Sequence, residues 1–157
     1  MEYTFEPMTV QAAQAIAQWH YPGIYKFYDL DEDPEDREEF LDPETWENAS
    51  FAVLNECQEL VGFFLFQQKN NALVLGLGMH PSYTGQGYGE AFVRAGMKFA
   101  NENYHPAVYR LSVATFNQRA IRVYEKLEFV PGRVFIQKTN GGEHEFIEMS
   151  HQIKELE

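Results

Sequence analysis

The stretch of sequence with the clearest chemical potential is a set of glycines at alternate positions, Gly85, Gly87 and Gly89. It follows residues 73–79, an apolar run that predicts a strand buried on both faces, and Pro81, which ends that strand because proline cannot donate to a sheet ladder. A helical pattern over residues 89–103 comes next. Glycine lets backbone N–H groups approach a ligand closely, and the first turn of a helix carries about half a positive charge. The arrangement predicts a site for a phosphate-bearing ligand.

The spacing of the glycines narrows the choice of ligand. A P-loop needs Gly-x-x-x-x-Gly-Lys-Ser/Thr, and no Lys-Ser or Lys-Thr follows these glycines. A dinucleotide fingerprint, Gly-x-Gly-x-x-Gly, would need glycine where the sequence has Glu90 or Phe92. Both nucleotide motifs are therefore excluded. A tight turn without a ligand stays open as an alternative for so short a motif.

Two motifs instead resemble the GNAT acetyltransferase superfamily. The first is Thr84-Gly85-Gln86-Gly87-Tyr88-Gly89, which is similar to the family's acyl-CoA loop, Gln/Arg-x-x-Gly-x-Gly/Ala, with Thr84 in the place of Arg or Gln. The second is Asn117-x-x-Ala120-x-x-x-Tyr124-Glu125-Lys126-Leu127-Glu128-Phe129, which resembles a phrase that follows the next strand, with Glu128 in the place of a glycine. Together they identify the chain as a member of the superfamily. The resemblance implies acetyl-CoA as co-substrate.

The resemblance also implies roles for particular residues. In similar enzymes a tyrosine at this helix position protonates or hydrogen-bonds the departing CoA sulfur, and Tyr124 occupies it. The other implied contacts are to the cofactor, and they are Leu77, Gly78, Met79, Thr84, Gly85, Gln86, Gly87, Tyr88, Gly89 and Asn117. Three alternatives stay open: Tyr124 as a core aromatic, Asn117 as a helix cap alone, and tight packing as the reason for Gly76 and Gly78.

No residue stands out as a general base. Family members often use a Glu on one of two neighbouring strands, but residues 73–79 and 108–116 contain no carboxylate, and Ser112 stands in the middle of the second run. The candidates elsewhere are His20, Asp29, Asp31 and His80. An amine that loses its proton to a chain of water molecules needs no dedicated base.

The acceptor is predicted from residues 19–28, the segment that lines the acceptor pocket in similar enzymes. We call residues 19–28 the aromatic segment because they are rich in aromatic rings. The acidic segment, residues 29–44, follows it and contains a single basic residue, Arg37. Aromatic faces beside carboxylates favour a cationic ligand, although most charge runs are solvated surface. The resemblance thus implies transfer of an acetyl group to a primary amine, preferably a small cationic one, directly within a ternary complex. A protein N-terminal acetyltransferase and a non-catalytic acyl-CoA-binding module are the alternatives.

The composition of the chain limits the kinds of molecule that we expect it to bind. The net charge of −12 argues against nucleic acid, whereas residues 85–138 carry eight basic against four acidic side chains, which suits a polyanionic cofactor. The apolar runs are too short to span a membrane, the N-terminus has no basic leader, and Cys57 is the only cysteine, so a cytoplasmic protein is expected. No metal is expected, and a homodimer is left open.

The elements that must position these residues follow from hydrophobic periodicity. Strands are predicted over residues 3–6, 51–54, 60–67, 73–79, 108–116, 134–138 and 145–149. Helices are predicted from an N-cap at Thr9 to about Trp19, over about 35–41, over 89–103 and after an N-cap at Asn117. The strand 108–116 should place Tyr109, Leu111 and Val113 on one face, and the helix 89–103 should place Phe92, Ala95 and Phe99 on one face. The order of these elements matches the GNAT fold. We therefore expect an α+β three-layer sandwich, with a central mixed and mostly antiparallel sheet flanked by helices, as a single domain over residues 1–157.

Overall fold

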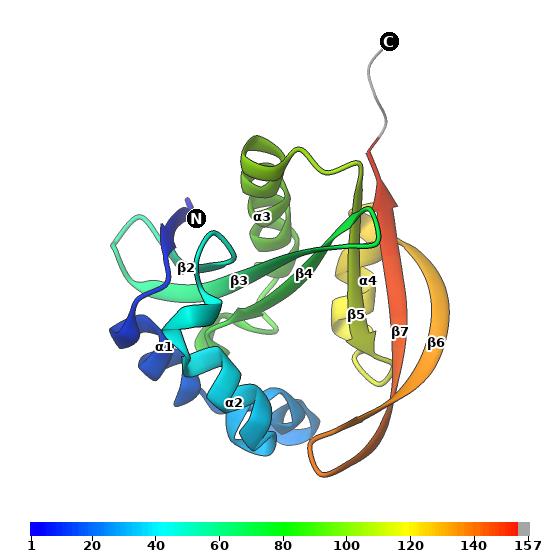
Figure 1. Cartoon of the computed structure of the whole chain (residues 1–157), viewed down its shortest axis with the longest axis horizontal. Helices are drawn as coiled ribbons and strands as arrows, with labels where there is room; N and C mark the ends of the chain where they lie inside the picture. Colours follow the sequence, from blue (N-terminus) through cyan, green and yellow to red (C-terminus); the bar gives the residue numbers. More distant parts are fainter. Residues whose placement is uncertain (154–157) are drawn as a thin grey trace. The chain divides into compact units, whose positions relative to one another are not determined.

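A computed structural model describes residues 1–153 of the chain. Its strands hydrogen-bond in the order β1-β2-β3-β4-β5-β7-β6, and helices flank them (Figure 1). The α+β class with a mixed, mostly antiparallel sheet is thereby confirmed. The chain forms two compact units that alternate along the sequence: the first holds residues 1–65, 77–84 and 138–143, and the second holds residues 66–76, 85–137 and those from 144 on. A single domain over residues 1–157 stays a prediction, and residues 154–157 lie outside the described part.

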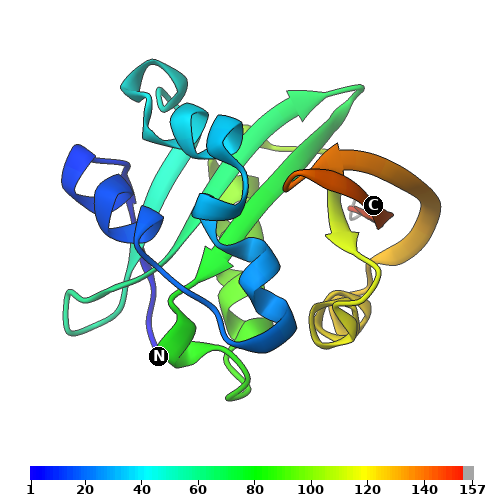
Figure 2. The same cartoon turned by 90° about the horizontal axis from the view of Figure 1, so that it is seen from below.

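The first unit is built on an antiparallel meander. β1 (Thr4–Pro7) pairs with β2 (Ser50–Leu54), and β2 pairs with β3 (Leu60–Lys69). Two helices, α1 (Val10–Ala17) and α2 (Pro34–Leu41), lie beside these strands (Figures 1 and 2). The predicted cap at Thr9 is confirmed, because its hydroxyl oxygen accepts a hydrogen bond from the Ala12 N–H at 3.1 Å. Ile16, Trp19 and Phe40 share one buried cluster, which anchors the aromatic segment at its start.

Asp33 holds the acidic segment in place. This segment comprises α2 together with the 3-10 helices η2 (Leu30–Glu32) and η3 (Pro43–Thr45), and it follows η1 (Gly23–Tyr28). One carboxylate oxygen of Asp33 caps α2 by accepting from two backbone N–H groups, those of Glu35 and Asp36. The other accepts from the Thr139 hydroxyl at 2.8 Å and the Asn140 N–H at 3.2 Å. These hydrogen bonds, the Thr139 one foremost, hold the pKa of Asp33 below its usual range.

The second unit places two helices beside β5 (Val108–Ala114). The strand pairs antiparallel with β7 (Gly142–Gln152), while β6 (Val130–Thr139) lies next to β7. The helices are α3 (Gly89–Tyr104) and α4 (Gln118–Lys126). The predicted buried face of the strand is confirmed by Tyr109, Leu111 and Val113. The predicted face of α3 was partly wrong: Phe92 is buried, but Ala95 and Phe99 are only half-buried. The other buried residues of the helix are Val93, Gly96 and Ala100. Glycine and alanine contribute little to a hydrophobic pattern, so the pattern does not predict the burial of Gly96 and Ala100.

β4 (Ala72–Met79) differs from its prediction as a strand buried on both faces. Its start is buried and pairs in parallel with β5, Leu73 beside Tyr109 and Val74 beside Arg110. Leu77 and Gly78, near its end, are only half-buried. A Cβ atom on Gly78 would lie 2.5 Å from Cε1 of Phe63, so this glycine admits the phenyl ring. Tight packing therefore accounts for Gly78, whether or not its backbone also contacts a cofactor.

Candidate active site

The glycine loop begins where β4 ends, after a short turn. His80 caps the 3-10 helix η4 (Pro81–Tyr83), and its Nδ1 accepts the Ser82 N–H at 3.1 Å. Thr84 closes the turn, since its hydroxyl donates to the Pro81 carbonyl at 2.8 Å and its N–H points to the same oxygen at 3.2 Å. Both donors of Thr84 are thus used within the turn. We expect Thr84 to position the loop, with the phosphate contacts made by the residues that follow it.

The presence of glycine at positions 85, 87 and 89 has more than one structural reason. Gly85 and Gly87 have φ values of +72° and +86°, in the left-handed region that favours glycine. A Cβ atom on Gly87 would have nothing within 4 Å, so open space borders the loop there. Gly89 instead packs α3 against α4, because its Cβ would lie 3.2 Å from Cγ2 of Val123. Gly87 therefore borders the space that an anion would occupy, with Gln86 exposed and Tyr88 half-buried on either side.

The N-terminus of α3 adds hydrogen-bond donors to this loop. Its N-cap residue, Tyr88, makes no side-chain hydrogen bond to the helix, and the first N–H groups of a helix have no acceptor within the helix itself. Glu90, in the first turn, is balanced by Arg94 at 2.9 Å. The loop and the helix end together form the kind of backbone cradle in which proteins bind phosphate.

Arg119 of α4 is a candidate site residue that sequence analysis missed. A Cβ atom on Gly85 would lie 3.0 Å from Nη1 of Arg119, so the guanidinium group lies directly against the glycine. It supplies a cation beside the loop at the point where Thr84 replaces the family's Arg or Gln. The sequence signal was weak: Arg119 was one of eight basic residues in the segment 85–138, and only the approach of α4 to the loop distinguishes it.

α4 starts and ends with well-formed caps. Asn117 is buried, and its Oδ1 accepts the Ala120 N–H at 3.1 Å, which confirms the predicted cap; a contact with pantetheine stays a prediction. At the other end the N–H of Phe129 donates to the Tyr124 carbonyl and that of Glu128 to the Glu125 carbonyl, a Schellman motif. The rings of Tyr124 and Phe129 complete it, with centroids 5.8 Å apart. The cap thus fixes the backbone of Tyr124. This tyrosine is buried, with 8% of its surface exposed.

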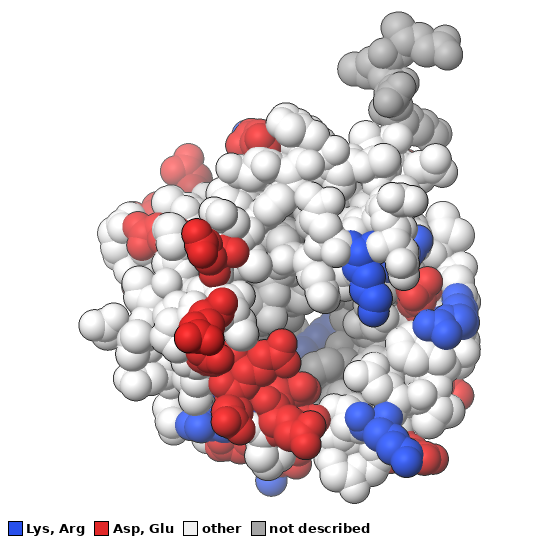
Figure 3. Space-filling model, in the orientation of Figure 1, with Lys and Arg blue, Asp and Glu red and all other residues white. Residues whose placement is uncertain are grey.

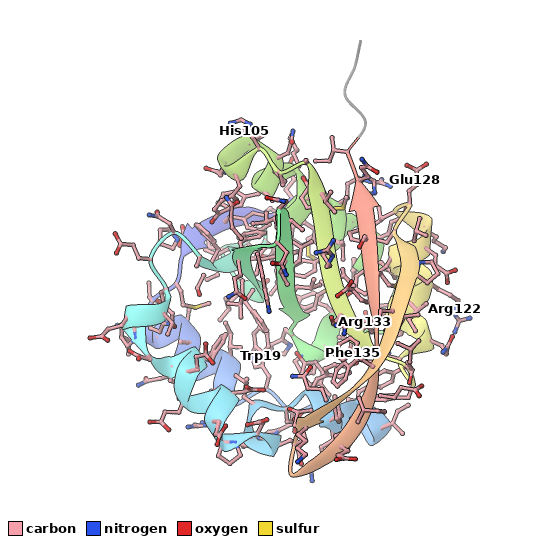
Figure 4. The ribbon with its side chains drawn as sticks, turned by 45° about the vertical axis from the view of Figure 1, so that its right-hand side comes forward. Trp19, His105, Arg122, Glu128, Arg133 and Phe135 are labelled. Carbon is pink, nitrogen blue, oxygen red and sulfur yellow. The ribbon has the colours of Figure 1, made fainter. Side chains whose placement is uncertain are left out.

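The Schellman motif makes a prediction about stability. Glu128, which follows α4 (Figure 4), has φ +66°, a left-handed conformation that disfavours residues with a side chain. Glu128→Gly is expected to raise the free energy of unfolding by about 1 kcal/mol, measured by urea denaturation. Glu128→Ala removes the charge and keeps the Cβ atom, so it should raise the free energy of unfolding only a little. If both variants raised the free energy of unfolding equally, the effect would come from removing the charge near the helix C-terminus. That result would contradict backbone strain as the cause.

In the first unit the aromatic segment is attached to the end of β4. The Tyr21 hydroxyl donates to the Met79 carbonyl at 2.7 Å, and Trp19 packs edge-on against His80 with ring centroids 5.1 Å apart. Burial, and to a lesser degree the carboxylate of Asp29, raises the pKa of Tyr21, so its phenol stays a donor. Because the Met79 carbonyl already accepts from Tyr21, a further contact through Met79 would use its N–H.

The first carboxylates of the acidic segment have structural partners. Asp31 lies 3.0 Å from Arg37, Glu32 lies 3.7 Å from Lys26, and the buried Asp29 accepts two hydrogen bonds. Figure 3 shows Asp and Glu side chains gathered over α2 and its surroundings. The exposed acidic residues there are Asp31, Glu35, Asp36, Glu38, Glu39, Asp42, Glu44 and Glu47. They form the acidic face of the first unit.

Two further features concern possible membrane-spanning helices and possible metal-ligating side chains. No helix within residues 1–153 is long and apolar enough to cross a membrane. Over that same part of the chain, no three His, Cys, Asp or Glu side chains are grouped so that they could hold a metal ion. The expectation that the protein needs no metal stays a prediction.

A glycine loop that leads into a helix N-terminus, beside a capped helix with a buried tyrosine, is the arrangement that the resemblance to acyl-CoA-binding enzymes implied. The sequence profile of the acetyltransferase (GNAT) family matches residues 13–129. The chain belongs to this family, and the assignment made from the two motifs is confirmed. A comparison with curated protein sequences found no match.

Solved structures agree on the fold. A chimera of spermidine N-acetyltransferase from Vibrio cholerae and hSSAT superposes with a TM-score of 0.78 at 18% identity, covering 97% of this chain and 96% of that one. An acetyltransferase (GNAT family) from Bacillus anthracis gives 0.76 at 16% identity, covering 97% and 95%. The spermidine N-acetyltransferase from Vibrio cholerae in complex with CoA and spermine gives 0.73 at 16% identity, covering 96% and 95%. At these identities the likeness concerns the fold.

Proposed function

We propose that this protein is an acetyl-CoA-dependent N-acetyltransferase that transfers the acetyl group directly to a primary amine within a ternary complex. The observation that carries the proposal is the open space beside Gly87, a positive-φ glycine just before the N-terminus of α3. A pyrophosphate suits this cradle because both the helix end and the glycine backbone offer N–H groups.

Each part of the second unit has a task in this proposal. The loop from Gly85 to Tyr88 would hold the pyrophosphate, with Arg119 neutralising part of its charge. Bound acetyl-CoA supplies an activated thioester. Tyr124 would donate a hydrogen bond or a proton to the sulfur as the thiolate leaves, since a phenol is a donor at neutral pH. The Schellman motif keeps Tyr124 in position, because it fixes both the backbone and the neighbouring ring.

The proposed acceptor is a small cationic amine. The acidic face and the aromatic segment of the first unit favour a cation, because carboxylates attract it and aromatic rings bind it by cation–π contact. The named neighbours that act on spermidine support this class, although their identity to this chain is low. A protein N-terminus is the alternative acceptor. Self-association as a homodimer stays a prediction.

The electrostatic part of the proposal predicts a salt dependence. Raising salt should lower kcat/KM for the amine steeply, since exposed charges are screened within about 8–10 Å. The paired carboxylates are poor targets for a test, because neutralising Asp29, Asp31 and Asp33 would disturb hydrogen bonds and ion pairs. A triple variant on exposed positions of α2 isolates the charge: Glu35→Gln, Glu38→Gln and Glu39→Gln.

This variant should reproduce at low salt the loss that the parent shows at high salt. A matched control neutralises the same number of exposed carboxylates elsewhere: Glu6→Gln, Glu102→Gln and Glu125→Gln. The control should retain the rate and the salt dependence of the parent. Equal rates for the two triple variants would make the acidic face an ordinary solvated surface.

The function itself is tested with a panel of amines and acetyl-CoA, followed by release of free thiol. The panel contains spermidine, spermine, glucosamine, a lysine-containing peptide and a peptide with a free N-terminus. Release with a polyamine or the amino sugar supports the proposal, and release only with peptides would favour the protein acetyltransferase. Tight CoA binding without release for any amine would identify a non-catalytic acyl-CoA-binding module, and displacement of CoA by ATP would contradict both.

A further inference from the structure

The second unit contains a pocket that the candidate active site does not use. Its volume is about 520 Å³, within the range of about 300–1,000 Å³ that is usual for small-molecule sites. The lining residues come from α3, β5, the C-terminal end of α4 and the end of β7, and all of them belong to the second unit. The pocket can therefore be described within one compact unit.

The inner surface of this pocket is apolar. Met97 of α3 and Tyr109 of β5 line it, together with Leu127 and Ile153. Tyr109 and Leu127 are buried, and Met97 and Ile153 are half-buried. These side chains offer a hydrophobic contact surface, and the flexible thioether of Met97 adapts well to the edge or face of an aromatic ring.

Two hydrogen bonds fix the lining. The Tyr109 hydroxyl donates to the Met97 carbonyl at 2.7 Å, which ties β5 to α3. Nδ1 of His151 lies 2.8 Å from the Leu127 carbonyl, which ties β7 to the end of α4. His151 donates this second hydrogen bond, because a carbonyl oxygen only accepts. The pocket is thus formed before any ligand binds, which lowers the cost of binding.

Three cationic side chains border the same pocket. Arg94 and Lys98 are one turn apart on α3, and Lys126 lies in the last turn of α4. All three are exposed, and Glu128 is the acidic residue beside them. Positive charge is therefore in excess here, although the chain as a whole has a net charge of −12.

The charges of the two lysines are available to a ligand. Within residues 1–153, the side chains of Lys98 and Lys126 have no hydrogen bond or ion pair. Arg94 contacts Glu90 through Nη2 at 2.9 Å, and a guanidinium group carries further N–H donors on its other nitrogens. The cations around the pocket can thus bind an anion without first losing a buried partner.

The pocket is separate from the glycine loop. Lys98 comes nine residues after Gly89, the first residue of α3, which corresponds to about 13 Å along the helix axis. Between the two places α3 and α4 are in contact, because a Cβ atom on Gly89 would lie 3.2 Å from Cγ2 of Val123. An anion bound by Lys98 and Lys126 therefore occupies a different site from a pyrophosphate at Gly87.

We propose that this pocket is a second ligand site, which binds a small organic phosphate with an aromatic body independently of CoA. The aromatic body covers the apolar surface of Met97 and Leu127. The phosphate group meets Arg94, Lys98 and Lys126, and it suits three cations better than a carboxylate does, because it carries more charge and three acceptor oxygens. This inference does not depend on acetyl transfer.

Calorimetry with 1-naphthyl phosphate tests the site, on the protein alone and on the protein saturated with CoA. One molecule should bind per chain, with the same affinity in both cases. Two partial probes separate the contributions, 1-naphthol without the charge and inorganic phosphate without the ring. Each should bind about 10-fold more weakly or worse, since it lacks either the charge-assisted hydrogen bonds or the apolar contact.

A pair of double variants locates the site. Lys98→Gln with Lys126→Gln should lower the affinity for 1-naphthyl phosphate by about 10-fold or more. Lys69→Gln with Lys138→Gln removes two exposed lysines elsewhere and should leave the affinity unchanged. In ¹³C-methyl NMR spectra the ring should shift the signals of Met97 and Ile153 and leave that of Met8, in the first unit, in place.

Several results would contradict the inference. Absence of binding would do so, and an equal loss of affinity in both double variants would reduce the effect to non-specific attraction of an anion. Competition by CoA and by dephospho-CoA would place the probe at the CoA site. Competition by CoA alone would mean that the pocket holds the 3′-phosphate of CoA itself. Failure of the proposed function is distinguishable from all of these, because no amine and no turnover enter the measurement.

Discussion

Replacing Gly87 with valine is expected to abolish CoA binding in a protein that still folds. Gly87 has φ +86° and open space beside it, so the branched side chain would occupy the space assigned to the pyrophosphate. Calorimetry with CoA should detect no binding at concentrations that saturate the parent. Far-UV circular dichroism should show the fold retained, since a Cβ atom at this position has no other atom within 4 Å.

Backbone strain is the competing explanation, and a second glycine controls for it. Gly141, in the turn between β6 and β7, has φ +75° and also nothing within 4 Å of a Cβ atom. Gly141→Val imposes similar strain away from the loop, about 1–2 kcal/mol, and should leave CoA binding intact. Unchanged binding in folded Gly87→Val protein would mean that the pyrophosphate binds elsewhere. Equal loss in both variants would assign the effect to stability.

Tyr124→Phe is expected to lower kcat by about 10²-fold or more with little change in CoA affinity. The phenyl ring can keep its packing on Phe129, 5.8 Å away between centroids, so only the hydroxyl is lost from a buried position. Steady-state kinetics with the best amine, together with calorimetry for CoA, separates the two quantities. A thiol with a lower pKa as leaving group should restore part of the rate, because it needs less help to depart.

Another buried tyrosine of the second unit provides the matched control. The Tyr109 hydroxyl donates to the Met97 carbonyl at 2.7 Å, and burial raises its pKa to about 12. Tyr109→Phe should therefore cost about 1 kcal/mol of stability and leave kcat unchanged. Full activity in Tyr124→Phe would make Tyr124 a core aromatic, which was the alternative that the sequence left open.

The fold was predictable because its local signals agree with one another. Thr9 and Asn117 were recognised as caps from residue type and position, and both side chains accept the expected N–H groups. Strand periodicity identified the buried face of β5. The errors concern Gly96 and Ala100 of α3, whose small side chains add little to a hydrophobic pattern. They also concern Leu77 and Gly78 of β4, which are half-buried although the strand is uniformly apolar.

The candidate site was predictable where it depends on backbone and unpredictable where it depends on contacts between distant residues. Positive φ at Gly85 and Gly87 agrees with the presence of glycine at these positions, and Glu128 shows why a glycine is usual after the tyrosine helix. The packing of Arg119 against Gly85 depends on how α4 approaches the loop, which no spacing in the sequence encodes. The partners of His20 and Asp33 likewise emerge only from the folded chain.

The central claim is that acetyl moves from CoA to an amine, and a single-turnover experiment tests it most directly. Protein in excess over acetyl-CoA is mixed with spermidine or the best amine of the panel, and free CoA and acetylated amine are quantified by mass spectrometry over time. The proposed function predicts that the two products appear together in equal amounts, with no acetyl group retained on the protein. Bound acetyl-CoA that stays intact with every amine, or CoA released without acetylated amine, would contradict it.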